Sequence, residues 1–210
     1  TIQSQASVSI TQIVDVTGHG VYVGGMAFTI RVDYSNTGGT DATGVDATLN
    51  YNGFSGLSSN NPTSVNVLAS GTNSQIFTID VSAGVASQNP VTIDASWTGT
   101  EQYSSRVLSG SSGSNDLDVA IQSQATLSIT SIDDVTGDGI YIGGESFTIR
   151  VNYQNSGGTD VLNVDATLDF NGYGDLTPND PSAITLGALS TGFQDFAIDV
   201  ATSAISQDPV

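Results

Sequence analysis

Residues 28–34 read FTIRVDY, and residues 147–153 read FTIRVNY. In both stretches apolar and polar side chains alternate along the chain. Successive side chains of a β-strand point to opposite faces of the sheet, so this alternation predicts a strand with one buried face. In the first stretch that face consists of Phe28, Ile30, Val32 and Tyr34.

The 119-residue spacing between these two stretches holds over most of the chain. Residues 2–25 read IQSQASVSITQIVDVTGHGVYVGG and return from residue 121 as IQSQATLSITSIDDVTGDGIYIGG. Aligned without a gap, residues 1–91 and 120–210 are identical at 49 of 91 positions. Such identity at a constant offset indicates an internal duplication. We expect a first repeat at residues 1–119 and a second at residues 120–210 that lacks the equivalent of residues 92–119.

Within one repeat, short alternating stretches are separated by turn residues. Alternation marks residues 8–13, 28–34, 45–51, 65–67, 77–81, 91–97 and 103–108. Pairs such as Asn52-Gly53 and Asn89-Pro90 lie between these stretches and are typical of turns. No window has the 3.6-residue period of a long amphipathic helix. About seven strands in roughly 100 residues predict an all-β fold of tandem immunoglobulin-like β-sandwiches.

Residues 109–116, SGSSGSND, form the one low-complexity stretch. Serine- and glycine-rich segments behave as flexible coils, so we interpret this stretch as a linker between the repeats. A hairpin tip inside the first repeat is the alternative, because the stretch is short enough for a loop within a domain.

One element recurs in both repeats: a strand that ends in Asn-[Ser/Thr]-Gly, a short polar loop, and a second alternating strand. It runs from residues 36–38 to Val45, and again from residues 155–157 to Val164. With LDVAIQSQATLSIT from Leu117, the element resembles the cell-adhesion-related domain found in bacteria (CARDB). It is also similar to Ig-like repeats of bacterial and archaeal surface proteins. This resemblance implies a sandwich that serves as a stalk or adhesion module, and it carries over no catalytic residue.

Charge and composition exclude several classes of partner. The net charge is −18, with three arginines as the only Lys or Arg residues among 210. Nothing here could neutralise phosphates, so nucleic acid is not expected as a partner. Cysteine is absent, which removes disulfides and thiolate metal sites. No apolar run approaches the ~20 residues that span a bilayer, so we expect no membrane insertion of this segment.

The sequence does not favour an enzyme. His19 is the only histidine, and the second repeat has Asp138 in its place. General-base catalysis needs an orienting partner and a nucleophile beside the histidine, and neither is indicated. The aspartates are scattered over turns, whereas glycoside hydrolysis requires two carboxylates at a defined separation in a cleft. We therefore predict a non-enzymatic protein without catalytic or cofactor-binding residues.

The loop at residues 134–145 is a candidate calcium site. Its spacing nearly fits an EF-hand loop, whose positions 1, 3, 5, 7 and 12 supply oxygen ligands. These positions hold Asp134, Thr136, Asp138, Ile140 and Glu145. In the first repeat the equivalents of Asp138 and Glu145 are His19 and Met26, so two ligands are lost together. A turn shaped by Asp and Gly alone is the competing interpretation.

These observations predict a structural extracellular repeat protein that forms a surface stalk, fibre or filament at the cell surface. The alternative is a ligand-recognition module, such as a carbohydrate-binding or adhesion module, of a larger secreted protein. Such modules present surface aromatics on one face, and Phe54, Tyr103 and Tyr173 are the candidates out of phase with the core. Trp97 is expected in the core.

The second repeat is expected to expose an apolar groove and unpaired strand edges, because it lacks two strands. Two explanations stand open. The missing strands can follow in the same chain, or a neighbouring repeat or subunit can supply them by strand addition, which would make self-association the main partnership.

Overall fold

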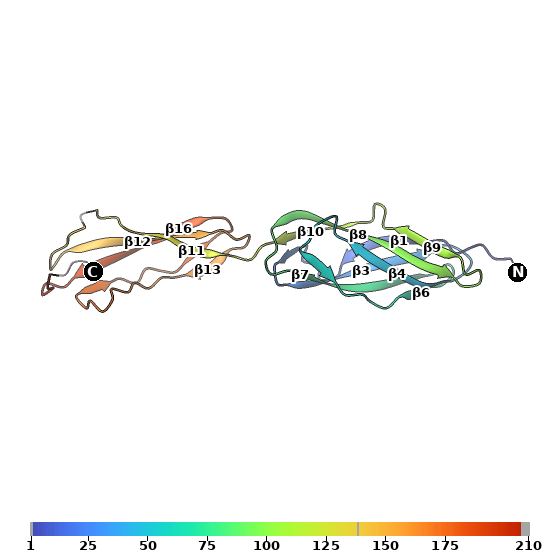
Figure 1. Ribbon diagram of the computed structural model, residues 1–210, viewed down its shortest axis with the longest axis horizontal. Helices are drawn as coiled ribbons and strands as arrows, with labels where there is room; N and C mark the ends of the chain where they lie inside the picture. The colour runs from blue at the N-terminus through green and yellow to red at the C-terminus, as the bar shows by residue number, and fades with distance from the viewer. Residues whose placement is uncertain (1, 138, 207–210) are drawn as a thin grey trace. The chain divides into compact units, whose positions relative to one another are not determined.

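The computed structural model describes residues 2–137 and 139–206 and shows an all-β protein without a helix in those ranges (Figure 1). This confirms the predicted all-β class. The chain divides into two compact units, Thr1–Gln124 and Ala125–Val210. We describe each separately as unit 1 and unit 2.

The first sheet of unit 1 contains four antiparallel strands in the order β1-β3-β7-β5. They are β1 (Val8–Asp15), β3 (Ala27–Asn36), β5 (Leu57–Ser59) and β7 (Thr72–Val81). β3 contains the FTIRVDY stretch and pairs along its length with β7, from Ala27↔Asp80 to Ser35↔Thr72. The alternation predicted for β3 is therefore present, with every second residue from Phe28 to Tyr34 buried.

The second sheet of unit 1 has the order β2-β10-β8-β4-β6, and β9 also pairs with β8. Its strands are β2 (Val21–Val23), β4 (Ala42–Asn50), β6 (Val65–Val67), β8 (Gln88–Glu101), β9 (Val107–Ser111) and β10 (Leu117–Gln122). The long strand β8 is the centre of this sheet. One edge of β8 pairs with β4, and the other pairs first with β10 and then with β9.

A single hydrophobic core lies between the two sheets of unit 1. Both sheets contribute to it in alternate positions, as expected when two sheets pack face to face. The largest fully buried side chains are Tyr22, Tyr34, Phe28, Phe77, Ile30, Ile79, Ile93 and Ile121. Trp97 is also buried, as predicted.

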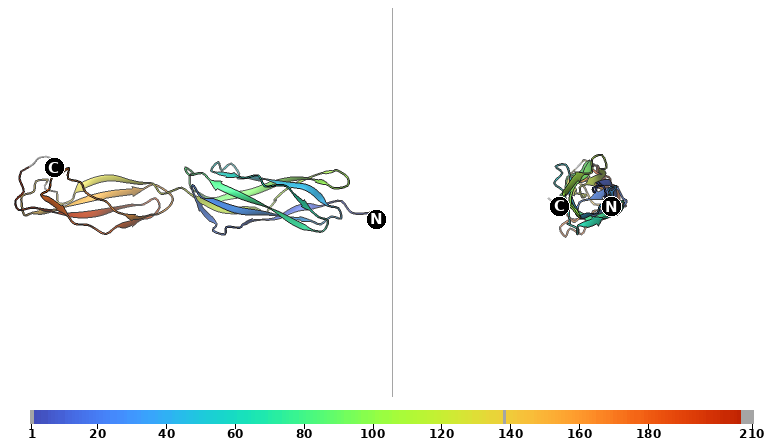
Figure 2. Two further views of the ribbon diagram at one scale, coloured as in Figure 1. Left: turned by 90° about the horizontal axis from the view of Figure 1, so that it is seen from below. Right: turned by 90° about the vertical axis from the view of Figure 1, so that its right-hand side faces the viewer.

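Unit 2 repeats only part of this arrangement. Its four-stranded sheet has the order β11-β12-β16-β14, made of β11 (Leu127–Asp134), β12 (Ser146–Asn155), β14 (Leu176–Pro178) and β16 (Thr191–Val200). Opposite it, β13 (Val161–Val164) and β15 (Ile184–Leu186) form a two-stranded sheet. A smaller core lies between them, around Val151, Tyr153, Phe196 and Ile198. Figure 2 shows the strands of both units in two further views.

The strand pairing corrects the interpretation of residues 109–116 as a linker. Residues 109–111 belong to β9, which pairs with β8 from Ser96↔Ser111 to Thr100↔Val107. Ser112 is buried, and its hydroxyl accepts a hydrogen bond from the Ala95 amide. Gly110 lies against Trp97, where an added Cβ would be 2.7 Å from the indole nitrogen. The stretch is therefore part of unit 1, close to the alternative interpretation of a loop inside the repeat.

The boundary between the units also differs from the sequence-based one. We predicted that the first repeat ends at residue 119, but the structure divides the chain after Gln124. The reason is β10, which pairs with β8 and in parallel with β2 through Gln122↔Val23. Unit 1 also contains ten strands rather than about seven, because β2, β5 and β10 were not predicted and β9 begins four residues late.

Candidate functional site

The candidate site is an exposed apolar face of unit 2. It corresponds to the face of unit 1 that β8, β9 and β10 cover. Ile10 of unit 1 is 3% exposed, whereas its counterpart Ile129 is 55% exposed. Ile13 is 6% exposed, and its counterpart Ile132 is 59% exposed. The same residue types thus change from core to surface because nothing within the described residues covers them in unit 2. We call this face the open face.

One border of the open face is an unpaired strand edge. In unit 1, β4 pairs with β8 from Ala42↔Glu101 to Asn50↔Asp94. In unit 2 the equivalent strand, β13, ends at Val164, and residues 165–170 form no strand. Those residues still carry the apolar alternation of Ala166, Leu168 and Phe170, which are partly buried against the small core. A segment with this pattern and no partner strand is a pairing edge.

The buried residues beneath the open face form the same internal hydrogen bonds as their counterparts in unit 1. In unit 1 the buried Gln75 accepts hydrogen bonds from the Tyr34 hydroxyl at 2.6 Å and from the Ala47 amide at 2.9 Å. In unit 2 Gln194 accepts the same two bonds, from Tyr153 at 2.6 Å and from the Ala166 amide at 3.0 Å. Residue 166 is therefore held in place without a partner strand.

The Asn side chain of the Asn-[Ser/Thr]-Gly element forms a buried hydrogen-bonded junction in both units. The Asn36 side chain accepts hydrogen bonds from the Ser7 and Gly38 amides and donates to the Thr40 and Val67 carbonyls. Asn155 does the same with Thr126, Gly157, Thr159 and Gly187. Each buried amide thus fixes the entering chain, the polar loop and a strand end together. This is the physical reason for the motif that the sequence repeats.

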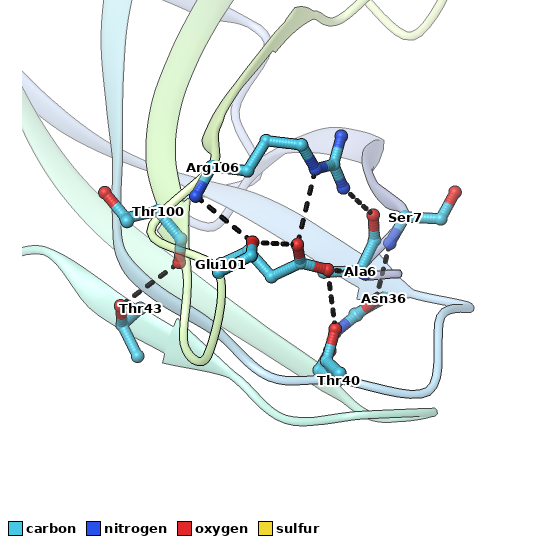
Figure 3. A network of polar contacts seen from close by, with 9 residues as sticks. Ala6, Ser7, Asn36, Thr40, Thr43, Thr100, Glu101 and Arg106 are labelled. Carbon is cyan, nitrogen blue, oxygen red and sulfur yellow. Dashed lines mark hydrogen bonds and ion pairs between the residues drawn. The ribbon is translucent and has the colours of Figure 1, made fainter. Parts of the chain in front are cut away.

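In unit 1 a carboxylate at the end of β8, that of Glu101, binds the same entering chain and polar loop (Figure 3). We call this network the Glu101 corner. Glu101 is 2% exposed, and its oxygens accept hydrogen bonds from the Ala6 amide at 2.6 Å and the Thr40 hydroxyl at 2.7 Å. Ser104 donates a further hydrogen bond to it, and Arg106 lies 3.4 Å away. Arg106 also donates to the Ala6 carbonyl at 2.9 Å.

The donors around Glu101 favour its charged form. The Ser104 hydroxyl, the Ala6 amide and the Thr40 hydroxyl lower its pKa to about 2, against an ordinary value of 4.5. A buried charge is tolerated only when hydrogen bonds replace its hydration, and this carboxylate meets that condition. Glu101 therefore joins β8 to the start of the chain and to the loop after β3.

The counterparts of two of these donors are present in unit 2. Ala125 and Thr159 occupy the positions of Ala6 and Thr40. Within residues 125–137 and 139–206, neither the Ala125 amide nor the Thr159 hydroxyl has a hydrogen-bond acceptor. At the end of the open face, unit 2 thus has two hydrogen-bond donors at the position where unit 1 has the Glu101 carboxylate.

The opposite end of each unit is closed by an aspartate and a tyrosine. In unit 1 the Asp15 carboxylate accepts hydrogen bonds from the Tyr22 hydroxyl at 2.6 Å and from the Gly18 and Gly20 amides. Burial, this hydrogen bond and the nearby carboxylate raise the pKa of Tyr22 to about 12. Asp134 and Tyr141 make the same bond in unit 2, and Tyr141 stacks on Phe147 with ring centroids 4.1 Å apart.

This geometry bears on the loop in which we predicted calcium. The Asp134 carboxylate accepts hydrogen bonds from Tyr141 and from the amides of Thr136, Gly137 and Gly139, and these donors lower its pKa. The Glu145 carboxylate accepts the Ile142 amide at 2.9 Å. Asp138 lies outside the described residues, and Ile140 is exposed. In the described part of the loop, Asp134 and Glu145 serve as acceptors for the loop's own donors.

Other candidate residues do not come together. His19 is exposed and stacks on Tyr22 with centroids 6.1 Å apart. Of the three aromatics considered for ligand binding, Tyr103 is exposed, Phe54 packs against the core, and the Tyr173 hydroxyl donates to the Ile205 carbonyl. The described residues contain no group of three or more His, Cys, Asp or Glu side chains placed to hold a metal ion.

Sequence reasoning missed the Glu101 corner. The available signal was composition: Glu101 is one of only two glutamates, the other being Glu145, in a chain whose acidic residues are otherwise aspartates. It also lies between the predicted strands at residues 91–97 and 103–108, five residues before Arg106. Nothing in the local sequence indicates its main partners, Ala6 and Thr40, because they are 95 and 61 residues away.

Comparison with known proteins leaves the chain without a family assignment. No family model and no curated protein matches it. Among solved structures it is similar to a protein of unknown function from Porphyromonas gingivalis W83, with 12% identity, a TM-score of 0.34, and coverage of 93% of this chain and 83% of that one.

Two further structures have still lower TM-scores. The secreted serine protease VesC from Vibrio cholerae is 10% identical, with a TM-score of 0.30 and coverage of 96% and 48%. The CsuC–CsuE chaperone–tip adhesion subunit pre-assembly complex from archaic Csu pili of Acinetobacter baumannii is 12% identical, with a TM-score of 0.26 and coverage of 96% and 90%. Scores this low carry no argument about function. In the part of the chain that is described, no helix is long and apolar enough to cross a membrane.

Proposed function

We propose that this chain is part of a structural, extracellular repeat protein that forms a surface stalk, fibre or filament from tandem immunoglobulin-like β-sandwiches. The observation that carries the proposal is the duplication of an internally bonded β unit, with the same buried Asn and Gln networks at Asn36 and Asn155 and at Gln75 and Gln194. Units of this kind joined in series provide length.

The distribution of polar chemistry supports this role over catalysis. The buried polar side chains that we describe bind backbone groups of their own unit and so stabilise the fold. Serine, threonine and asparagine dominate the exposed positions of the strands, as on β1 and β7. The resemblance of the Asn-[Ser/Thr]-Gly element to surface repeats supports a location outside the cell.

Imaging of the native assembly tests this proposal. Antibodies raised against residues 1–210 should label extended stalks or filaments on intact, unpermeabilised cells in electron micrographs. Labelling that requires permeabilised cells would contradict the extracellular location. A native particle that is a compact globule would contradict the structural role and favour the ligand-recognition alternative.

A further inference from the structure

We propose that a pocket between two loops of unit 1 binds a neutral carbohydrate, with a sugar ring against Phe54 and its hydroxyls at Asn52 and Gln88. The first loop, residues 52–56, lies between β4 and β5, and the second, residues 82–88, leads from β7 into β8. We call this site the loop pocket. Carbohydrate binding goes beyond the structural role proposed above and does not depend on it.

The loop pocket has the size and the lining of a small-molecule site. Its volume is about 590 Å³, within the roughly 300–1,000 Å³ typical of ligand pockets. Its apolar part consists of Phe54, which is partly buried against the core, and Val85, which is 7% exposed. The other lining residues are small or carry an uncharged polar group: Asn52, Gly53, Ser55, Gly56, Ser82, Gly84, Ala86 and Gln88. Such a lining suits a ligand with one apolar face and a polar rim.

Gly56 holds the apolar part of the loop pocket in place. A Cβ atom at residue 56 would be 2.1 Å from Cγ2 of Val85 and 2.9 Å from Cε1 of Phe54. Carbon atoms pack at about 3.5–4.0 Å, so only glycine lets these two side chains lie this close to the backbone. The Phe54 ring is therefore positioned before a ligand arrives, and a site formed in advance loses less conformational freedom on binding.

Two side-chain amides of the loop pocket are oriented by the backbone. The Asn52 side chain donates to the Thr92 carbonyl at 3.1 Å, and the Gln88 side chain donates to the Pro90 carbonyl at 3.3 Å. Each bond uses one of the two N–H groups of an amide, which leaves one N–H donor and the carbonyl acceptor for a ligand. A hydroxyl group can donate and accept, so neighbouring sugar hydroxyls match both groups of such an amide.

The charge of the lining favours a neutral ligand. None of the residues that line the loop pocket is charged. An anion would be repelled by the net charge of −18 and would find no cation in the pocket. A cation would lose hydration without a carboxylate to replace it. A neutral sugar combines a C–H face for Phe54 with hydroxyls for the amides, and so fits both parts of the lining.

The equivalent loops of unit 2 differ in the residues that form the pocket. Tyr173 takes the position of Phe54, and its hydroxyl donates to the Ile205 carbonyl of the opposite loop at 2.6 Å. Phe54 has no hydroxyl, so this bond between the loops has no equivalent in unit 1. Asp175 takes the position of Gly56 and adds a carboxylate. We therefore expect carbohydrate binding in unit 1 and not in unit 2.

A nuclear magnetic resonance titration of the full 210-residue chain tests the proposal. The probes are neutral α- and β-linked di- and trisaccharides of glucose, galactose, mannose and N-acetylglucosamine. At least one of them should shift the amide resonances of residues 52–56 and 82–88 in a saturable way. Residues 171–175 should not shift, and a disaccharide that contains glucuronic acid should bind more weakly than its neutral counterpart.

Substitutions copied from unit 2 provide a variant that should still fold. Phe54→Tyr, Gly56→Asp and Val85→Ala, made together, give the residues that unit 2 has at these positions and should abolish the saturable shifts. Gln88→Ala should weaken binding by up to about tenfold, as for the loss of one hydrogen bond. Tyr103→Ala removes an exposed aromatic ring outside the pocket and should leave the affinity unchanged. Unchanged resonances in the rest of unit 1 verify that each variant is folded.

Three results would overturn the proposal. They are the absence of saturable shifts at the loop pocket with every neutral probe, undiminished binding by the folded triple variant, and equal binding of the glucuronic acid probe. Unchanged affinity in Gln88→Ala would overturn the role of its amide. Surface labelling of cells is independent of all these measurements, so failure of carbohydrate binding would leave the proposed structural function standing.

Discussion

The aligned segments of unit 1 and unit 2, within residues 1–91 and 120–210, are identical at 49 of 91 positions but differ in which side chains they bury. The hydrogen bonds of the Asn, Gln and Asp–Tyr networks are present in both, so they depend only on the shared segments. Burial of Ile10 and Ile13, and the strand at residues 46–50, occur only where β8–β10 are present. Local polar networks thus shape the unit, while the last strands complete its core.

Differences between the repeats are also compensated locally. Arg31 pairs with Asp33 on its own strand at 2.7 Å, but the position of Asp33 is Asn152 in unit 2. Arg150 instead pairs at 2.7 Å with Asp195 of the neighbouring strand β16 and lies over the Phe193 ring. Both pairs are partly exposed, so each contributes little to stability, and the exchange leaves the fold unchanged.

The largest effect is expected at Trp97, which has no counterpart in the described residues of unit 2. Trp97→Ala should destabilise unit 1 by about 3–5 kcal/mol because it removes a large buried side chain and leaves a cavity. Denaturant unfolding followed by circular dichroism measures this loss, with a separate transition for each unit. Tyr103→Ala at an exposed site is the control and should change stability by less than about 0.5 kcal/mol. A loss in unit 2 would show that its stability depends on unit 1.

A matched pair of isoleucines measures the difference in burial directly. Ile10→Ala should cost unit 1 about 2–5 kcal/mol, as for other buried isoleucines. Ile129→Ala should cost unit 2 less than about 1 kcal/mol, because more than half of that side chain is already in water. Thermal unfolding of the two variants compares them. Similar losses in both units would mean that the open face is covered in solution.

The Glu101 corner predicts a contribution to the pH dependence of unit 1, in addition to that of the lowered carboxyl pKa values present in both units. The pKa of Glu101 is lowered in the folded state, so its contribution is fully present above about pH 4.5 and is lost as the pH falls toward 2. The melting temperature of unit 1 should therefore fall less steeply over this window in Glu101→Gln than in the wild type. Asp15 and Asp33 also have lowered pKa values and leave a residual slope. Glu145→Gln in unit 2 is the control; an unchanged slope in Glu101→Gln argues against the charged corner.

The smallest expected effect concerns the calcium hypothesis for residues 134–145. At a calcium concentration equal to a weak dissociation constant, binding stabilises unit 2 by about 0.4 kcal/mol. Calorimetry with and without added calcium should show this shift in the wild type and not in Asp138→Ala. Unit 1, with His19 at the matching position, provides the internal comparison. Equal shifts in both units would rule out this loop as the cause.

The sequence was sufficient for seven of the ten strands of unit 1 and for most of its core, because alternation reports directly which side chains face inward. It was misleading for residues 109–116, where serine, glycine and asparagine imitate a linker. In the structure these residues are held by specific hydrogen bonds: the Asn115 side chain donates to the Ile10 carbonyl at 3.0 Å, and the Ser112 hydroxyl donates to the Asp116 carboxylate. A flexible coil and a tightly bonded turn can have the same content of small polar residues, so composition alone cannot distinguish a coil from a turn.

The candidate site was predictable in outline but not in chemistry. The gapless duplication predicts that unit 2 shares the buried Asn and Gln networks of unit 1, and the hydrogen bonds of Asn155 and Gln194 agree with this. The carboxylate corner was not predictable, because Glu101 finds its donors through contacts between distant segments. The calcium loop shows the reverse problem: a spacing that matches a ligand pattern is also what an aspartate needs to accept the amides of a glycine turn, as Asp15 and Asp134 both do.

The hydrogen-bonded junction at Asn36 has a mechanical consequence. Tension applied to the N-terminal end of the chain reaches the Ser7 amide and the Ala6 backbone before it reaches the ladder between β1 and β3. These groups are held by Asn36, Glu101 and Arg106, so the pull is divided among three clamps on different segments. At the corresponding point of unit 2, Asn155 holds Thr126, and the Glu101 and Arg106 clamps have no counterpart in the described residues. At the entry of unit 1, rupture therefore requires hydrogen bonds on three different segments to break together.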